Sequence, residues 1–306
     1  MKTRFIVNPI SANRATEKRW PAIQRLLESV YPFEFEAVFT EKPLHETELA
    51  REGILEGNDR IISVGGDGTL NGVLNGFFEH GRFLGQGVAL GVLEIGTGAD
   101  FAKTLGLPSE TEDAINRLTR AQPRKIDVGR AIFLSLDGNQ IARYFINILD
   151  FGVGGAVVER VNRTTKRFGG KISFLWAILV TLLRYQNKKI RYRLDEGEWK
   201  SGVLNNFIVA NGRYFGGGLL PTPAAELDDG WFDVALFGDL GRWEAIANLP
   251  SLRAGTHLSN PHVQIVRARQ IEAESDEVVF IDMDGDLVGQ LPITISIMPG
   301  VLLFLQ

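Results

Sequence analysis

The sequence predicts two domains: an α/β domain with a doubly wound parallel sheet over residues 1–128, then a mainly β domain over 129–297. The length of 306 residues fits two domains of about 150 residues each. Apolar segments before Lys125 alternate between strand and helix spacing, whereas strand-like runs dominate after it. The last residues, 298–306, either end the second domain or return to the first.

The first domain follows a β-α-β-α order, which implies a parallel sheet with right-handed crossovers. The helix that opens near residue 109 begins with the capping-box pattern Ser109-Glu110-Thr111-Glu112. Apolar periodicity predicts strands at 5–7, 33–39, 60–64 and 88–93, and helices at 20–30, 44–54, 70–77 and 109–121.

The second domain contains strand-like runs interrupted by two helical stretches, near 170–186 and 241–254. The strand-like runs cover 126–136, 141–149, 206–210, 231–236, 278–283 and 293–297. The ten apolar residues 174–183 are too few to cross a hydrocarbon core of about 30 Å. They predict a buried helix or the wall of an apolar ligand site, and attachment to a membrane surface stays open.

Charge and composition exclude several classes of protein. Lys and Arg number 33 and Asp and Glu number 37, so the net charge of −4 argues against a nucleic-acid binder. The absence of cysteine excludes disulfides and thiolate metal sites and fits a reducing, cytoplasmic compartment. No apolar signal segment follows the charged N-terminus, and the four scattered histidines predict no zinc site.

The segment Gly65-Gly66-Asp67-Gly68-Thr69 links a predicted strand to a predicted helix. Glycines let a backbone approach a phosphate closely, and a helix N-terminus attracts anions. Asp67 suits such a site only if Mg²⁺ or a substrate hydroxyl is present. The alternative is a tight turn in which Asp67 caps the helix.

Further motifs occur in order along nearly the whole chain. They are Asn8-Pro9-x-Ser11, the Gly-Gly-Asp-Gly-Thr turn, 96–103 (GTGADFAK), 126–129 (IDVG), 145–147 (FIN) with 152–154 (GVG), 211–218 (NGRYFGGG), Pro223-x-Ala225-x-Leu227-Asp228-Asp229-Gly230 and Asp284-Gly285-Asp286. Together they resemble the diacylglycerol kinase catalytic domain family, and especially its bacterial soluble lipid kinases. The resemblance implies a β-sandwich-like second domain for the lipid, with the active site in the cleft between the domains.

The same resemblance implies a lipid kinase that uses ATP and Mg²⁺. Asp67 and Asp100 would act near the phosphates, and Asp286 would be the general base, one methylene shorter than the usual glutamate. Without the resemblance, Asp286 reads as part of a hairpin turn. The implied ATP-binding residues are Asn8, Thr40, Gly65, Gly66, Asp67, Gly68, Thr69, Leu70, Asn71, Gly72, Gly96 and Thr97.

The resemblance also implies a structural Mg²⁺ held by Asp229 and the carbonyls of Phe232 and Val234. A plain Asp-Asp-Gly turn is the alternative. Two positions depart from the family pattern: Glu94 replaces a proline, and Ala99 replaces an asparagine that helps to position the nucleotide.

A kinase of this kind must reach its lipid at a membrane surface. Arg14, Lys103, Arg167 and Lys171 are candidates for contact with anionic lipids, with ordinary solvated helix faces as the alternative. We expect transient peripheral membrane contact, and the oligomeric state stays open.

These expectations combine into an ATP-dependent kinase that phosphorylates a hydroxyl of diacylglycerol or of a related glycerolipid or sphingoid lipid. An NAD kinase-like enzyme shares the Gly-Gly-Asp-Gly turn and is the enzymatic alternative. A catalytically silent nucleotide or lipid sensor is the alternative outside enzymes.

Overall fold

The structure, a computed structural model, describes residues 1–95, 99–164 and 171–306. The chain forms two compact units. Unit 1 contains residues 1–128 and 300–306, and unit 2 contains residues 129–299. Each is described by itself below.

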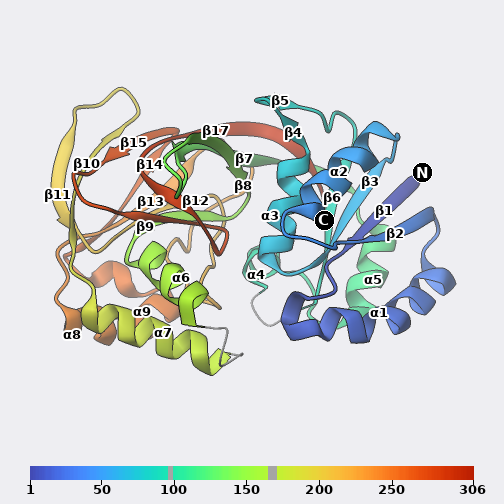
Figure 1. The fold of residues 1–306 in the computed structure, drawn as a ribbon, viewed down its shortest axis with the longest axis horizontal. Coiled ribbons are helices and arrows are strands. Elements are labelled where there is room, and N and C mark those ends of the chain that lie inside the picture. Colours follow the sequence, from blue (N-terminus) through green and yellow to red (C-terminus); the bar gives the residue numbers. More distant parts are fainter. Residues whose placement is uncertain (96–98, 165–170) are drawn as a thin grey trace. The chain divides into compact units, whose positions relative to one another are not determined.

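Unit 1 is built on a parallel sheet in the order β2-β1-β3-β6-β17, to which β17 contributes only its last residues (Figure 1). A short β4–β5 hairpin lies apart from this sheet. The elements are β1 (Lys2–Val7), α1 (Ser11–Val30), β2 (Glu34–Phe39), α2 (His45–Leu55), β3 (Arg60–Gly65), α3 (Asp67–Gly76), β4 (Phe78–Glu79), β5 (Arg82–Phe83), β6 (Ala89–Glu94), α4 (Asp100–Thr104) and α5 (Thr111–Arg120).

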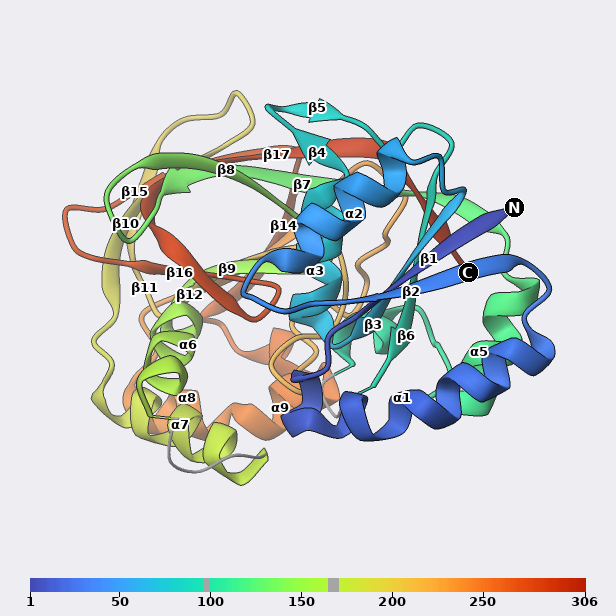
Figure 2. The ribbon, with the colours of Figure 1, turned by 45° about the vertical axis from the view of Figure 1, so that its right-hand side comes forward.

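The order of strands in unit 1 reverses at β1. The chain goes from β1 to β2 on one side and then to β3 on the other side of β1. Helices α2 and α3 pack together on one face of the sheet, and α1 and α5 pack together on the opposite face (Figure 2). Because helices cover both faces, β3 is buried along its whole length, from Arg60 to Gly65.

The C-terminal segment returns to unit 1 as an additional parallel strand. Leu303 and Phe304 of β17 (Asp286–Leu305) pair with Ala89 and Leu90 of β6. Leu302, Phe304 and Leu305 are fully buried. Of the two roles that the sequence left open for 298–306, the structure therefore shows the return to the first domain for residues 300–306.

Unit 2 is mainly antiparallel. One run of strands has the order β14-β13-β12-β9-β16-β17, and β17 also pairs with β7 and β15, which connect to β8, β10 and β11. The elements are β7 (Pro123–Leu134, which begins in unit 1), β8 (Gln140–Phe145), β9 (Ile148–Gly152), α6 (Val153–Thr164), α7 (Lys171–Arg184), β10 (Lys188–Leu194), β11 (Lys200–Leu204), β12 (Asn206–Ala210), β13 (Phe232–Phe237), α8 (Arg242–Ala247), α9 (Leu249–Ala254), the 3₁₀ turn η1 (His257–Ser259), β14 (Val263–Ala268), β15 (Gln270–Glu274) and β16 (Phe280–Met283).

Aromatic side chains fill the core of unit 2. Phe145 stacks on Phe232 with ring centroids 5.5 Å apart, and Phe151 stacks on Phe207 at 4.6 Å. Helix α6 packs on β9 and β16 and against α7, and α7 contacts α8. These helices lie together beside the sheet of unit 2 (Figure 2).

The predicted fold class, an α/β domain followed by a β-sandwich-like domain, is confirmed. Three local features differ from the sequence-based description. The run 141–149 is two strands, β8 and β9, because the Asp284 carboxylate accepts the backbone N–H groups of residues 146–148 and interrupts the ladder. Helix α6 was not expected. Helix α5 begins at Thr111 with Glu110 at its N-cap and has no side-chain cap, so the capping box at Ser109 does not form.

Candidate active site

The carboxyl ends of β1 and β3 lie next to each other in unit 1, where the strand order reverses. In open α/β sheets, ligands bind in the crevice at such a switch point. The Asn8 side chain, just after β1, donates from Nδ2 to Thr69 Oγ1 at 3.0 Å, and the Asn8 N–H donates to the Val64 carbonyl. Asn8 thus ties the turn after β1 to the turn after β3.

Gly65 is required at this turn by close packing. A Cβ on Gly65 would lie 2.4 Å from Thr69 Oγ1, whereas a Cβ on Gly66 would meet no atom within 4 Å. The backbone at Gly66 therefore faces open space. This arrangement brings the chain close to the start of α3 and leaves room in front of it.

The first turn of α3 offers N–H groups to an anion. The first helical hydrogen bond runs from the Leu70 N–H to the Gly66 carbonyl, so the N–H groups of Asp67, Gly68 and Thr69 precede it. The helix dipole adds positive potential at this end. Three other predicted ATP-binding residues, Leu70, Asn71 and Gly72, are buried within unit 1.

Asp67 links two strand-to-helix turns. Its oxygens accept the backbone N–H groups of Asp100 and Phe101, both at 3.1 Å, at the start of α4. Burial and the neighbouring Asp100 raise the pKa of Asp67, although these two hydrogen bonds oppose the shift. The two turns therefore meet, as expected from their positions after adjacent strands.

A third carboxyl group lies beside this pair. Burial, Asp67 and Asp100 raise the pKa of Glu94, the last residue of β6, to about 9. The Lys103 ammonium, one of the candidates for contact with lipid, donates to Asp100 Oδ1 at 2.8 Å. One lysine thus faces three acidic groups at this edge of the sheet.

Thr40, Gly96 and Thr97 are the remaining predicted ATP-binding residues. Thr40 follows β2, is buried, and its N–H donates to the Val7 carbonyl. Gly96 and Thr97 lie outside the described residues. Ala99, at the N-cap of α4, has a left-handed backbone with φ of 50°, a conformation that asparagine adopts more readily than alanine.

In unit 2, Asp284 and Asp286 lie on either side of Gly285 at the turn between β16 and β17 and have different roles. The buried Asp284 carboxylate accepts three backbone N–H groups, from Ile146, Asn147 and Ile148, at 2.9 to 3.2 Å. Asp286, the predicted general base, is exposed at the first position of β17. Asp284 therefore anchors the turn that presents Asp286.

The predicted Mg²⁺ ligands do not fit a metal site as they lie. Asp229 Oδ1 accepts the Trp231 N–H at 3.0 Å, and Oδ2 accepts from the Arg267 guanidinium. A guanidinium supplies the positive charge that a cation would bring. Phe232 and Val234 lie on β13, a central strand with partners on both sides. Among the described residues, no group of three or more acidic or histidine side chains could hold a metal ion.

The structure covers only part of the predicted lipid-docking set. Arg14 is exposed and pairs with Glu17 at 3.2 Å. Arg167 lies outside the described residues, and so does the side chain of Lys171, the first residue of α7. Within the described part of the chain, no helix is both long and apolar enough to cross a bilayer.

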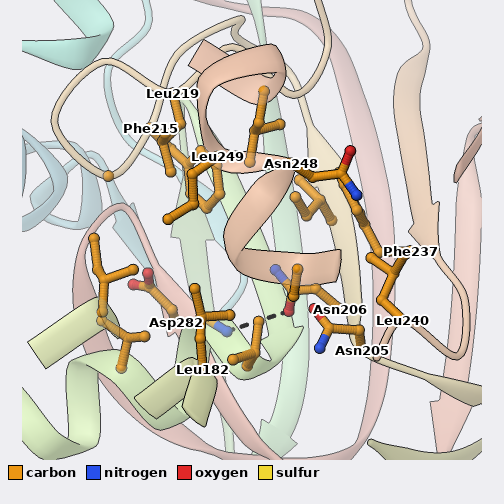
Figure 3. A pocket seen from close by; sticks show the side chains of 18 of the residues that line it. Leu182, Asn205, Asn206, Phe215, Leu219, Phe237, Leu240, Asn248, Leu249 and Asp282 are labelled. Carbon is orange, nitrogen blue, oxygen red and sulfur yellow. Dashed lines mark hydrogen bonds between the residues drawn. The ribbon is translucent and has the colours of Figure 1, made fainter. Parts of the chain in front are cut away.

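Unit 2 contains an apolar cavity of about 100 Å³, which the sequence indicated only through the apolar run 174–183 (Figure 3). That run lies in α7, where Ile178 and Leu182 line the cavity while Trp176 is 67% exposed. Helix α7 is thus partly buried and forms one wall of this cavity. Other lining residues include Val157, Phe215, Leu219, Phe237, Leu249 and, among polar ones, Asn205, Asn206, Asn248 and Asp282.

Two family models together match most of the chain. The diacylglycerol kinase catalytic domain matches residues 2–131, and the YegS C-terminal NAD kinase beta sandwich-like domain matches residues 147–306, more than half of the chain. The chain therefore belongs to the diacylglycerol kinase family with a YegS-type C-terminal domain. It is an enzyme of the lipid kinase class.

Individual relatives agree with this family. The chain is 28% identical to a diacylglycerol kinase of Staphylococcus carnosus over 296 residues, 95% of this chain and 90% of the relative. It is 28% identical to a diacylglycerol kinase of Bacillus subtilis over 292 residues, 95% of this chain and 91% of the relative. The crystal structure of a diacylglycerol kinase from Bacillus anthracis shares the fold, with a TM-score of 0.70, 20% identity, and coverage of 99% and 96%.

Proposed function

We propose that this lipid kinase transfers the γ-phosphoryl group of ATP to a hydroxyl of diacylglycerol or of a related glycerolipid or sphingoid lipid. The observation that carries the proposal is the pair of linked turns at the switch point of unit 1. Asn8 and Thr69 join the ends of β1 and β3, and Asp67 joins the ends of β3 and β6. The start of α3 lies between them.

Phosphoryl transfer requires placement of the phosphates more than covalent chemistry. The N–H groups of Asp67, Gly68 and Thr69 can donate hydrogen bonds to phosphate oxygens, with Gly66 leaving space for them. Mg²⁺ would arrive with ATP as part of the substrate. Of the four acceptor positions of the Asp67 carboxylate, two are used by backbone N–H groups, which leaves two for water or ligand.

The acceptor side of the reaction belongs to unit 2. The cavity of about 100 Å³, lined mainly by apolar side chains, suits hydrocarbon and supports a lipid acceptor. Asp286 is the candidate general base, since it lies on a turn that three hydrogen bonds to Asp284 stabilise. Desolvation raises the pKa of its carboxyl group, which favours proton acceptance, and Arg143 opposes this shift. The exposed Trp176 of α7 and Trp243 of α8 support contact with a lipid surface.

Transfer of radiolabelled phosphate tests the proposal. With γ-labelled ATP and Mg²⁺, we expect label in diacylglycerol or a related lipid and none in NAD. Asp286→Asn should lower the rate by about 10²- to 10⁴-fold, because it removes the proton acceptor. Asp276→Asn, on an exposed loop, is the matched control and should retain activity.

Two results would contradict the proposal. Labelling of NAD without any labelled lipid would identify an NAD kinase-like enzyme. Binding of ATP without transfer to any acceptor would identify a silent sensor. A near-normal rate for Asp286→Asn would remove Asp286 from the role of base while leaving the lipid kinase activity in place.

A further inference from the structure

Two carboxyl groups lie buried side by side in unit 2, and one of them lines the cavity. Asp150 of β9 and Asp282 of β16 are directly opposite in the antiparallel pair, so their side chains are on the same face. Their exposed fractions are 1% and 8%. Asp282 lines the cavity, where its carboxylate lies among apolar side chains such as Leu182 (Figure 3).

Neither carboxylate has a cationic partner among the residues that the structure describes. Asp282 Oδ1 accepts the Gly285 N–H at 3.0 Å, and Asp150 Oδ1 accepts the Asn206 amide at 3.2 Å when that amide is oriented to use its donors. Asp150 Oδ2 is buried without any partner. An ionised carboxylate that is buried without a cationic partner destabilises the folded protein unless a proton or a cation neutralises it.

The surrounding charged groups do not supply that cation. Asp284 and Asp286 on the hairpin are of the same sign, and Tyr185 after α7 adds no positive charge. On α6, which packs on β16, the Arg163 guanidinium pairs with Glu159, and Arg160 donates to Thr181. Burial raises the pKa of Asp150 to about 7, and burial and Asp150 raise the pKa of Asp282 well above its ordinary value.

We infer that the cavity binds an amphiphile whose alkyl chain lies among the apolar side chains and whose protonated amine lies at Asp282, with Asp150 behind it. The ammonium group would replace the proton that the pair otherwise holds, and it would donate charge-assisted hydrogen bonds to the carboxylates. This inference rests on the proposed function, because it names an amino lipid as the acceptor class of that kinase.

The alternative ligand is a neutral alcohol, which could also hydrogen-bond to a protonated carboxyl group. The two ligands differ in their coupling to protons. An ammonium that displaces a proton from the pair binds more tightly as the pH rises, whereas a neutral alcohol gains nothing from the charged pair. This difference provides the test.

Calorimetric titration with octylamine and with octanol, without any nucleotide, separates the two. Because a charge-assisted hydrogen bond is lost in the alcohol, we expect octylamine to bind at least about tenfold more tightly at neutral pH. From about pH 6 to pH 8 its affinity should rise and proton release should accompany binding, since the amine stays protonated over this range. Octanol should show neither effect.

Two variants test whether Asp150 and Asp282 cause the preference for the amine. Asp282→Asn should abolish the preference for the amine while keeping the shape of the cavity, and Asp150→Asn should reduce both the preference and the proton release. Asp276→Asn is the control for attraction of amines to surface carboxylates. Melting temperatures check folding, and we expect neither buried variant to melt below the parent, because each removes an uncompensated carboxyl group.

Equal affinities for amine and alcohol, or a preference that survives in Asp282→Asn, would overturn the inference. Since no phosphoryl transfer is measured, this failure would leave the proposed kinase activity untouched. Conversely, absence of transfer in the labelling experiment would not affect the binding result.

Discussion

Glu94 is a buried carboxylic acid where the family pattern has proline. It ends β6 beside Asp67 and Asp100, and burial and these two groups raise its pKa to about 9. At neutral pH it is protonated and can donate a hydrogen bond. The substitution therefore adds no negative charge to a region that is proposed to bind phosphates, which makes it compatible with that role.

Glu94→Gln should stabilise the protein increasingly as the pH rises. The unfolded chain loses this proton near the ordinary glutamate pKa, whereas the folded chain holds it up to about pH 9, so folding stability falls between these values. Glutamine removes this dependence, and the difference should grow by up to about 1.4 kcal/mol per pH unit. Urea denaturation at about pH 5 and pH 8 measures it.

The exposed Glu112→Gln is the matched control for this comparison, because its side chain lies in solvent on α5. If Glu94→Gln and the parent lose stability in parallel over this pH range, Glu94 is ionised in the folded protein.

Among the elements, the β16–β17 hairpin contacts the junction between β8 and β9. Asp284 at its turn has a φ of 50° and accepts the N–H groups that end β8 and begin β9. Its own N–H donates to the Ile148 carbonyl at 2.9 Å. One side chain, distant in sequence, thus divides the apolar run 141–149 into two strands.

Asp284→Ala should destabilise unit 2 by about 3 kcal/mol or more, because several buried N–H groups lose their acceptor together. Denaturant unfolding measures the loss. Asp276→Ala, in the loop before the same hairpin, should change stability by less than about 0.5 kcal/mol. A similar small change for both variants would show that Asp284 does not hold the hairpin.

Helix α7 shows that an apolar run does not predict which face of a helix is buried. Its run of apolar residues predicted a buried helix or the wall of a ligand site. In the structure one face of the helix forms a wall of the cavity, and another face is exposed. Ile178 and Leu182 line the cavity, whereas Trp176 is exposed. Hydrophobicity alone does not reveal which face of such a helix packs, since every face is apolar.

At the scale of the whole molecule, the chain leaves unit 1 and comes back to it. The last strand, β17, belongs to unit 2 up to Pro299 and to unit 1 from Gly300 onward. Within unit 1, Phe304 packs edge-on against Phe101 of α4 with centroids 5.3 Å apart, and Arg117 donates to the Leu305 carbonyl at 2.8 Å. The end of the chain thus supports α4, the helix that Asp67 contacts.

Removal of residues 300–306 should unfold unit 1 selectively. Leu302, Phe304 and Leu305 are fully buried, and each contributes about 1.5 to 3 kcal/mol, a sum comparable to the stability of a domain. Limited proteolysis with mass spectrometry should show cleavage within residues 1–128 and protection of 129–299. Gln306→Ala, which keeps the strand, is the control.

Protection of residues 1–128 in the truncated protein would contradict this prediction and would show that the sheet of unit 1 is stable without its last strand.

Much of the candidate site followed from local sequence. The Gly-Gly-Asp-Gly-Thr segment predicted a strand-to-helix turn whose backbone could approach a phosphate. In the structure glycine is needed at Gly65 because a Cβ there would collide with the Thr69 side chain. Glycine requirements and strand-end positions are local, so spacing reveals them. By contrast, the contacts of Asp229 with Arg267 and of Lys103 with Asp100 depend on which side chains the fold brings together.

By itself, the sequence determined the class of fold, the positions of the strand-to-helix turns and the family, because these depend on periodicity and on motifs read along the chain. Only the tertiary structure decided that Asn8 reaches Thr69, that Asp284 divides a strand, and that Asp150 and Asp282 lie opposite each other. The physical reason is that strand register and side-chain burial are set by pairing between distant segments, which no local pattern specifies.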